Sequence, residues 1–158
     1  MDNLNREKLI KQSILIASIS MFIGCFIYIF LRPVEALGVK ELVSHLRIIK
    51  ELREYTTQYR LSNWILYSLP NGLWTFSYSL IIFSIWLGVR TKEATIWLVT
   101  IPIVGFTYEI FQYLDIIKGT FCTDDMIYSL IGILLSFSII KIKLWRGTKW
   151  RKETVYYQ

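Results

Sequence analysis

Apolar residues along this chain gather in four long uncharged runs, not in the one-sided stripes of helices on a soluble core. The runs cover 13–31, 61–89, 94–108 and 126–140, which are 19, 29, 15 and 15 residues long. A helix needs about 20 apolar residues to cross a hydrocarbon core about 30 Å thick. The first two runs are long enough alone, and the last two reach this length with their flanking residues. The pattern therefore predicts an all-α membrane protein.

We expect a single membrane domain over residues 1–158, built as a four-transmembrane-helix bundle. The predicted spans are about 12–31, 71–89, 93–113 and 124–142, followed by a basic tail over 143–158. Proline is tolerated in a first helical turn, so the second span is expected to begin directly after Pro70. The first run exceeds the roughly 7–15 apolar residues of a signal peptide, which favours a retained helix over a cleaved leader.

The basic residues predict the orientation of these spans. With the N-terminus inside, the inner segments carry 11 of the 18 Lys and Arg residues, and the outer loops 32–60 and 114–125 carry 7. Because Lys and Arg concentrate on the cytoplasmic side of membrane proteins, both termini are expected in the cytoplasm. The net charge of +6 lies at the ends of apolar runs, where it suits lipid headgroups better than nucleic acid.

The first outer loop carries a second kind of pattern. Leu42, Leu46 and Ile49 recur at helical spacing between charged residues, which predicts an amphipathic helix over 38–55. Such a helix either lies on the outer leaflet or packs on neighbouring protein. The two cysteines, Cys25 and Cys122, are far apart and lack the paired spacing of a disulfide framework or a thiolate zinc site.

One acidic residue stands inside the third predicted span. Glu109 follows 15 uncharged residues, and Gln112 shares its helical face. Ionisable groups within membrane helices are rare and usually functional. Other polar residues are expected on the same outer side, at the ends of the other spans and in the first turns of the fourth. The resulting candidate pocket comprises Glu109, Gln112, Asp125, Asp124, Asn71, Ser129 and Arg32.

A purely structural role for these groups stays open. Glu109 would then pair with Arg32 or Arg60, and Asp124 and Asp125 would only cap the fourth helix. If Glu109 and Asp125 share a pocket, they repel each other unless a proton, a cation or a basic side chain lies between them. Arg32 and Lys118 are the basic side chains expected nearby, and magnesium or calcium are the metal ions that oxygen ligands favour.

Three short motifs resemble those of a known family. They are Glu109-x-x-Gln112, a loop containing Gly119-Thr120-Phe121, and Asp125-x-x-x-Ser129-x-x-Gly132. Over about residues 61–140 this pattern is similar to the VanZ-like family of small bacterial integral membrane proteins. In that family Arg often stands at the position of Thr120 and Asn at that of Ser129, and an Asp-Lys…His motif that this chain lacks opens an earlier helix. The resemblance implies the bacterial plasma membrane, an envelope-linked role and a connection with resistance to glycopeptide antibiotics.

The function expected from these features is binding in an outward-facing polar pocket. The ligand would be an envelope lipid, a lipid-linked glycan or an amphiphilic drug, with membrane lipids as general partners. Two alternatives stay open: an envelope-lipid enzyme with Glu109 or Asp125 as general base or metal ligand, and a small proton-coupled carrier. The sequence lacks a Ser-His or Cys-His arrangement, which argues against ordinary acyl hydrolysis. Four helices without an internal repeat disfavour a carrier acting alone, whereas a homo-oligomer would restore that option.

Overall fold

Helices make up every regular element in the described part of this computed structural model. It describes residues 3–32, 47–56, 61–117 and 120–155, and the side chains of 3–5, 47, 48, 50, 54 and 146–155 are excluded. The elements are α1 (Asn3–Phe26), a π-helical segment η1 (Ile27–Leu31), α3 (Arg47–Thr56), α4 (Asn63–Trp86), α5 (Lys92–Tyr113) and α6 (Thr123–Val155). The all-α prediction is therefore confirmed for these residues.

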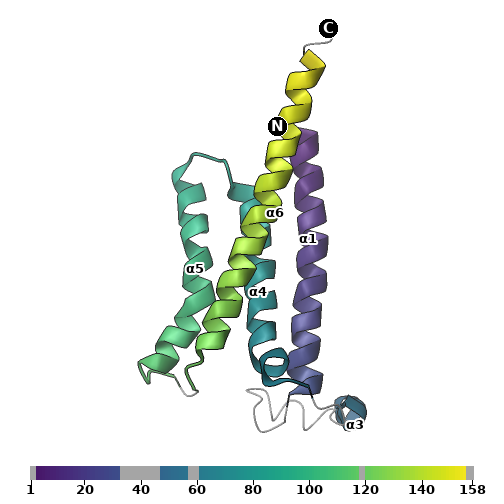
Figure 1. Ribbon diagram of the computed structural model, residues 1–158, viewed down its shortest axis with the longest axis vertical. Coiled ribbons are helices and arrows are strands. Elements are labelled where there is room, and N and C mark those ends of the chain that lie inside the picture. Colours follow the sequence, from purple (N-terminus) through teal and green to yellow (C-terminus); the bar gives the residue numbers. More distant parts are fainter. Residues whose placement is uncertain (1–2, 33–46, 57–60, 118–119, 156–158) are drawn as a thin grey trace.

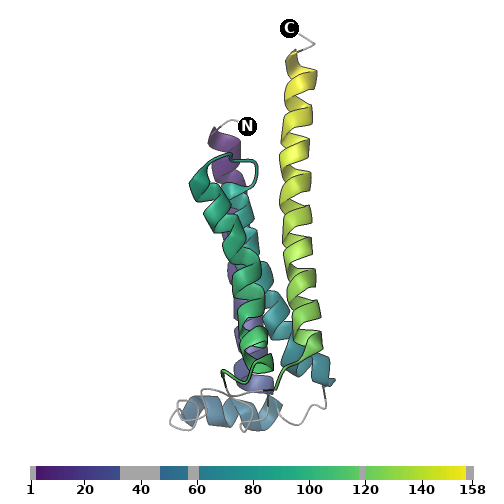
Figure 2. The ribbon, with the colours of Figure 1, turned by 90° about the vertical axis from the view of Figure 1, so that its left-hand side faces the viewer.

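Helix α4 is the centre of the bundle. It packs against α1, α5 and α6, and its most extensive contact is with α6. Figures 1 and 2 show α1 and α5 on either side of α4, with α6 crossing over it. Successive long helices run in opposite directions, so the start of α1 and the end of α6 lie at the same end of the bundle (Figure 1). Helix α3 and the connection from α5 to α6 lie at the opposite end.

The bundle buries small hydroxyl side chains and exposes large apolar ones. Ser68, Ser77, Ser79 and Ser136 are at most 2% exposed, whereas Phe22 of α1 is 71% exposed. A soluble protein keeps large apolar side chains inside. Three helical segments are long and apolar enough to cross a membrane, namely Arg6–Leu31, Lys92–Tyr113 and Thr123–Trp145. The chain thus has the features of a membrane protein.

Helix α4 differs from these three in composition. It has no charged residue over 24 residues, yet five of its ten buried residues carry hydroxyl groups. Three helices pack against it, so these small polar side chains lie between helices and not on the outside of the bundle. The hydroxyls do not need water, since Ser77 and Ser79 each donate to the backbone carbonyl four residues earlier at 2.7 Å.

The ends of several helices differ from the predicted ones. Helix α4 begins at Asn63 instead of 71, so Pro70 lies inside it and not in its first turn. Helix α1 begins at Asn3 instead of 12, and α6 continues to Val155 where a tail from 143 was predicted. Lys, Arg and Glu are good helix formers, so a helix that starts in an apolar run continues into its charged flanks.

A proline inside a helix removes one backbone donor and bends the helix. The lower part of α4 departs from the direction of the remainder in Figures 1 and 2. Pro70 leaves the Leu66 carbonyl without its usual donor. Arg32, at the end of η1, donates from Nε to this carbonyl at 2.9 Å and from Nη2 to the Tyr67 carbonyl at 2.8 Å. This arginine therefore compensates for the break.

Helix α3 lies across the lower end of the bundle in Figure 2 and serves as a cap for α1 and η1. Its Arg53 is buried and donates to the carbonyls of Ile29 and Arg32. Thr56 donates to the Phe30 carbonyl at 2.7 Å. The last carbonyls of a helix need such external donors. The amphipathic helix predicted over 38–55 thus exists over Arg47–Thr56, and residues 38–46 lie outside the described part of the chain.

Candidate functional site

Two acidic side chains lie buried together where α5 ends and α6 begins. Glu109 in the last turns of α5 is 4% exposed, and Asp125 in the first turn of α6 is 9% exposed. The carboxyl group of Asp125 lies close enough to that of Glu109 for its charge to act on it. The cluster forms at the end of the bundle that also carries α3. We call Glu109, Asp125 and Asn71 the carboxyl cluster.

Asn71 ties the carboxyl cluster to the central helix. Its Nδ2 donates to Oδ2 of Asp125 at 2.7 Å. Asn71 directly follows Pro70, at the place where α4 bends, and this position brings it to the start of α6. The cluster therefore joins three helices, α4, α5 and α6, by polar contacts.

Glu109 also caps the start of α6. The backbone N–H of Cys122 donates to Oε2 of Glu109 at 3.1 Å, and α6 begins at the next residue, Thr123. The first N–H groups of a helix have no partner within it, and the positive end of the helix dipole favours an acidic group. The Cys122 N–H thus occupies one oxygen of Glu109, and the helix dipole stabilises one negative charge at this end of α6.

One oxygen of the cluster has no such partner. Oδ1 of Asp125 is buried and accepts no hydrogen bond from a donor among the described residues. Leaving a buried acceptor unpaired costs about 1–3 kcal/mol. This oxygen is the unsatisfied position of the carboxyl cluster, and any chemistry proposed for the site must account for it.

The other predicted site residues lie around this cluster or away from it. Ser129 is 2% exposed and accepts from Thr75 Oγ1 at 3.3 Å, one turn further along α6. Gln112 is half-buried and Asp124 is exposed at the rim. Arg32 is not joined to the cluster, because its guanidinium donates to α4 carbonyls and lies over the rings of Tyr28 and Tyr67. Lys118 lies outside the described residues.

A polar ladder between α4 and α6 continues from the cluster, and the sequence reasoning missed it. Its rungs are Asn71–Asp125, Thr75–Ser129 and Ser79–Ser136, the last at 2.7 Å between hydroxyl oxygens. Two glycines keep these helices close: a Cβ on Gly132 would lie 2.6 Å from the Gly72 carbonyl oxygen. The available signal was the four-residue spacing of Asn71, Thr75 and Ser79 within an apolar run. Small and hydroxyl residues of this kind are typical of helix contacts in membranes.

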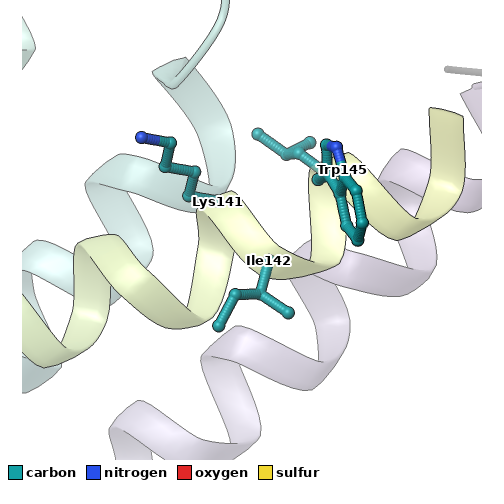
Figure 3. A pocket seen from close by; sticks show the side chains of 4 residues that line it. Lys141, Ile142 and Trp145 are labelled. Atoms are coloured by element: carbon teal, nitrogen blue, oxygen red, sulfur yellow. The ribbon is translucent and has the colours of Figure 1, made fainter. Parts of the chain in front are cut away.

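A shallow hollow lies elsewhere on α6, near its basic half. It has a volume of about 440 Å³ and is lined by Lys141, Ile142, Leu144 and Trp145. Figure 3 shows Lys141, Ile142 and Trp145 projecting from α6. Nζ of Lys141 lies over the ring of Phe137, 5.4 Å from its centre. The hollow contains none of the residues of the carboxyl cluster, so it is separate from it.

The carboxyl cluster has a limited capacity for metal ions. Among the residues that the structure describes, no three His, Cys, Asp or Glu side chains stand together so as to hold one. Magnesium and calcium take six or more oxygen ligands. Glu109, Asp125 and the Asn71 side chain provide at most part of such a set, and two of their oxygens already accept hydrogen bonds. The arrangement is better suited to hydrogen bonding and proton binding.

Comparisons with known proteins return no match for this chain, whether with protein-family models, with curated proteins or with solved structures. The likeness to the VanZ-like family therefore rests on the three motifs alone. Two of the motif residues, Glu109 and Asp125, are the ones that the structure brings together.

Proposed function

We propose that this chain is a VanZ-like integral membrane protein that binds the polar part of an envelope amphiphile at the carboxyl cluster. The ligand class is an envelope lipid, a lipid-linked glycan or an amphiphilic drug, with a link to glycopeptide resistance. The observation that carries the proposal is the buried Oδ1 of Asp125, which has no donor among the described residues and lies at one end of an apolar bundle. A ligand hydroxyl or amine could donate to this oxygen, which no N–H group of the described residues does.

Aromatic residues around the cluster support a ligand that has both polar and apolar parts. Trp64 of α4 stacks on Tyr128 of α6 with ring centres 5.7 Å apart. Tyr113 and Phe121, on either side of the α5–α6 connection, meet edge to face at 5.3 Å. Trp and Tyr are enriched where hydrocarbon meets water. The polar head of such a ligand would hydrogen-bond to Asp125, and its apolar chain would pack along these rings.

The proposed protein crosses the bacterial plasma membrane four times, with both termini in the cytoplasm. Helix α4 counts as the fourth span in this proposal because it has 24 uncharged residues and packs between the other long helices. The shared end of α1 and α6 in Figure 1 supports an even number of spans. The excess of Lys and Arg on the segments at this end supports the cytoplasmic side. The carboxyl cluster would then face outward.

The test is whether lipids stay bound to the purified protein through Asp125. Wild-type protein and the variants Asp125→Asn and Asp124→Asn are purified in mild detergent from bacterial membranes, and bound lipids are measured by native mass spectrometry. Asp124 is the matched control, since it is the exposed neighbour in the same helical turn with the same charge. We expect wild type and Asp124→Asn to retain a lipid-sized adduct that Asp125→Asn loses. Equal adducts in all three proteins, or none in wild type, would contradict the proposal.

A further inference from the structure

We propose that the Glu109 and Asp125 carboxyl groups share one proton, so that the ligand-free cluster carries one negative charge and not two. The proton lies on the Glu109 carboxyl and is donated to Oδ1 of Asp125. The shared proton does not depend on the function proposed above. If a ligand donates to Oδ1 of Asp125, it takes the place of this proton, and that step alone rests on the proposed function.

The hydrogen bonds of the cluster are the first support. Oε2 of Glu109 accepts from the Cys122 N–H, and Oδ2 of Asp125 accepts from Asn71. Oδ1 of Asp125 is buried and has no donor among the described residues. Ionised carboxylates only accept hydrogen bonds, so two of them cannot bond to each other. A single proton on one carboxyl supplies a donor that two ionised carboxylates lack.

Burial is the second support, because it limits what else can lie between the two groups. Glu109 is 4% exposed and Asp125 is 9% exposed. Two unscreened carboxylates in one confined site repel, and one of them then holds a proton. A divalent ion would need more oxygen ligands than the cluster offers. A proton needs no additional space and no additional ligand.

Three arginines in the described part of the chain donate hydrogen bonds away from the carboxyl cluster. Arg32 and Arg53 donate to backbone carbonyls at the end of η1 and in α4, and Arg6 donates to the Ile85 carbonyl at the end of α4. Lys118 lies outside the described residues and is therefore included in the test as a variant. Each of these arginines is used at a helix end or at the proline break, so none neutralises the carboxyl pair.

The titratable groups near the cluster come from all three helices and the α5–α6 connection. Asp125 is the charged group that acts on Glu109. Asp124 and Asp115 are exposed, and exposed charges contribute less because water screens them. The other titratable groups on these elements near the same end are Tyr67 of α4, Tyr108 and Tyr113 of α5, Tyr128 of α6 and Cys122 in the connection. Glu109 and Asp125 are the two carboxyl groups in this set that are buried, and the proposal assigns the shared proton to them.

Infrared spectroscopy tests the shared proton directly. The full chain is reconstituted in lipid nanodiscs at neutral pH with a chelator, and the carbonyl stretch of a protonated carboxyl group is recorded in H2O and D2O. We expect wild type to show this band with a shift in D2O, and expect the band to be lost in Glu109→Gln and in Asp125→Asn. The control Asp124→Asn should keep it. A wild-type spectrum without the band, or a band that persists in both cluster variants, would overturn the proposal.

Two further arms distinguish a cation from a proton. If the band appears only after chelation, a divalent ion holds the pair together, and if it appears only in Lys118→Gln, the lysine does; either result overturns the proposal. Folding is checked by thermal unfolding. The amide of Glu109→Gln accepts from Cys122 and donates to Asp125, as a protonated carboxyl does. We expect this variant to unfold within a few degrees of wild type, and a large loss of stability would contradict the shared proton.

Discussion

Arg32 donates to the one carbonyl of α4 that Pro70 leaves without a helical donor, the carbonyl of Leu66, at 2.9 Å. The second guanidinium bond, to Tyr67, and the two flanking aromatic rings hold this side chain in place. Arg32 was predicted to belong to the polar pocket. Its position indicates instead that it allows α4 to bend while its backbone stays bonded, and the bend brings Asn71 to Asp125.

The first prediction concerns this relationship. Arg32→Ala should lower the free energy of unfolding by about 1–3 kcal/mol, because the part-buried Leu66 carbonyl loses its donor. In a Pro70→Ala background the helix supplies its own N–H to Leu66, so the same substitution should have a smaller effect. Thermal and denaturant unfolding of the four proteins in detergent gives the coupling. Strictly additive effects would mean that Arg32 does not compensate for the proline.

A second prediction concerns the close contact of α4 and α6. Gly132→Ala places a Cβ 2.6 Å from the Gly72 carbonyl oxygen and 3.0 Å from the Phe76 backbone nitrogen, so the two helices must move apart. We expect a loss of about 1–3 kcal/mol, as for other overpacked sites. Gly105→Ala is the matched control, because its Cβ meets mainly the Thr75 Cγ2 at 3.1 Å. Equal stability of the two variants would show that α6 tolerates the shift.

A third prediction separates the two roles of Glu109. Glu109→Ala removes the acceptor for the Cys122 N–H and the neighbour of Asp125, so it should lose about 1–3 kcal/mol of stability. Glu109→Gln keeps an acceptor and a donor and should lose less than half of that. Unfolding curves for both variants, beside Asp124→Asn as an exposed acidic control, provide the comparison. A glutamine variant as unstable as the alanine variant would show that the negative charge itself is required.

The sequence allowed the helices and part of the site to be predicted for simple physical reasons. Long uncharged runs predict helices whatever their neighbours are, and α5 over Lys92–Tyr113 agrees with the predicted 93–113 within one residue. Glu109 stood out because charge is rare in such runs. Its proximity to Asp125 followed from the short connection between α5 and α6, which keeps their ends adjacent.

The remaining features depend on contacts between distant parts of the chain. The start of α4 at Asn63 depends on a donor from Arg32, which is 34 residues from Leu66 in the sequence. No local rule reveals that a proline break will be compensated in this way. The rung between Ser79 and Ser136 likewise depends on how α4 and α6 align. Hydroxyl spacing alone indicates a helix contact, but it does not specify the partner.

The number of spans gives the last prediction, because each crossing reverses the side of every later segment. Single cysteines are introduced at Glu7, at Arg90 in the turn between α4 and α5, and at Ile116 after α5, in a chain whose Cys25 and Cys122 are replaced by serine. All three positions are exposed. Four spans with the N-terminus inside place Ile116→Cys outside, and Glu7→Cys and Arg90→Cys inside. If α4 does not cross, Arg90→Cys lies outside and Ile116→Cys lies inside.

A membrane-impermeant maleimide applied to intact cells distinguishes these topologies. We expect rapid labelling of Ile116→Cys, and labelling of the other two only after the membrane is permeabilised. Labelling after permeabilisation is the control for reactivity, since it shows that a protected cysteine is accessible once the reagent can enter. Labelling of Arg90→Cys but not Ile116→Cys in intact cells would mean that α1, α5 and α6 cross and α4 does not. Labelling of Glu7→Cys and Arg90→Cys together, without Ile116→Cys, would invert the four-span orientation and place the carboxyl cluster on the cytoplasmic side.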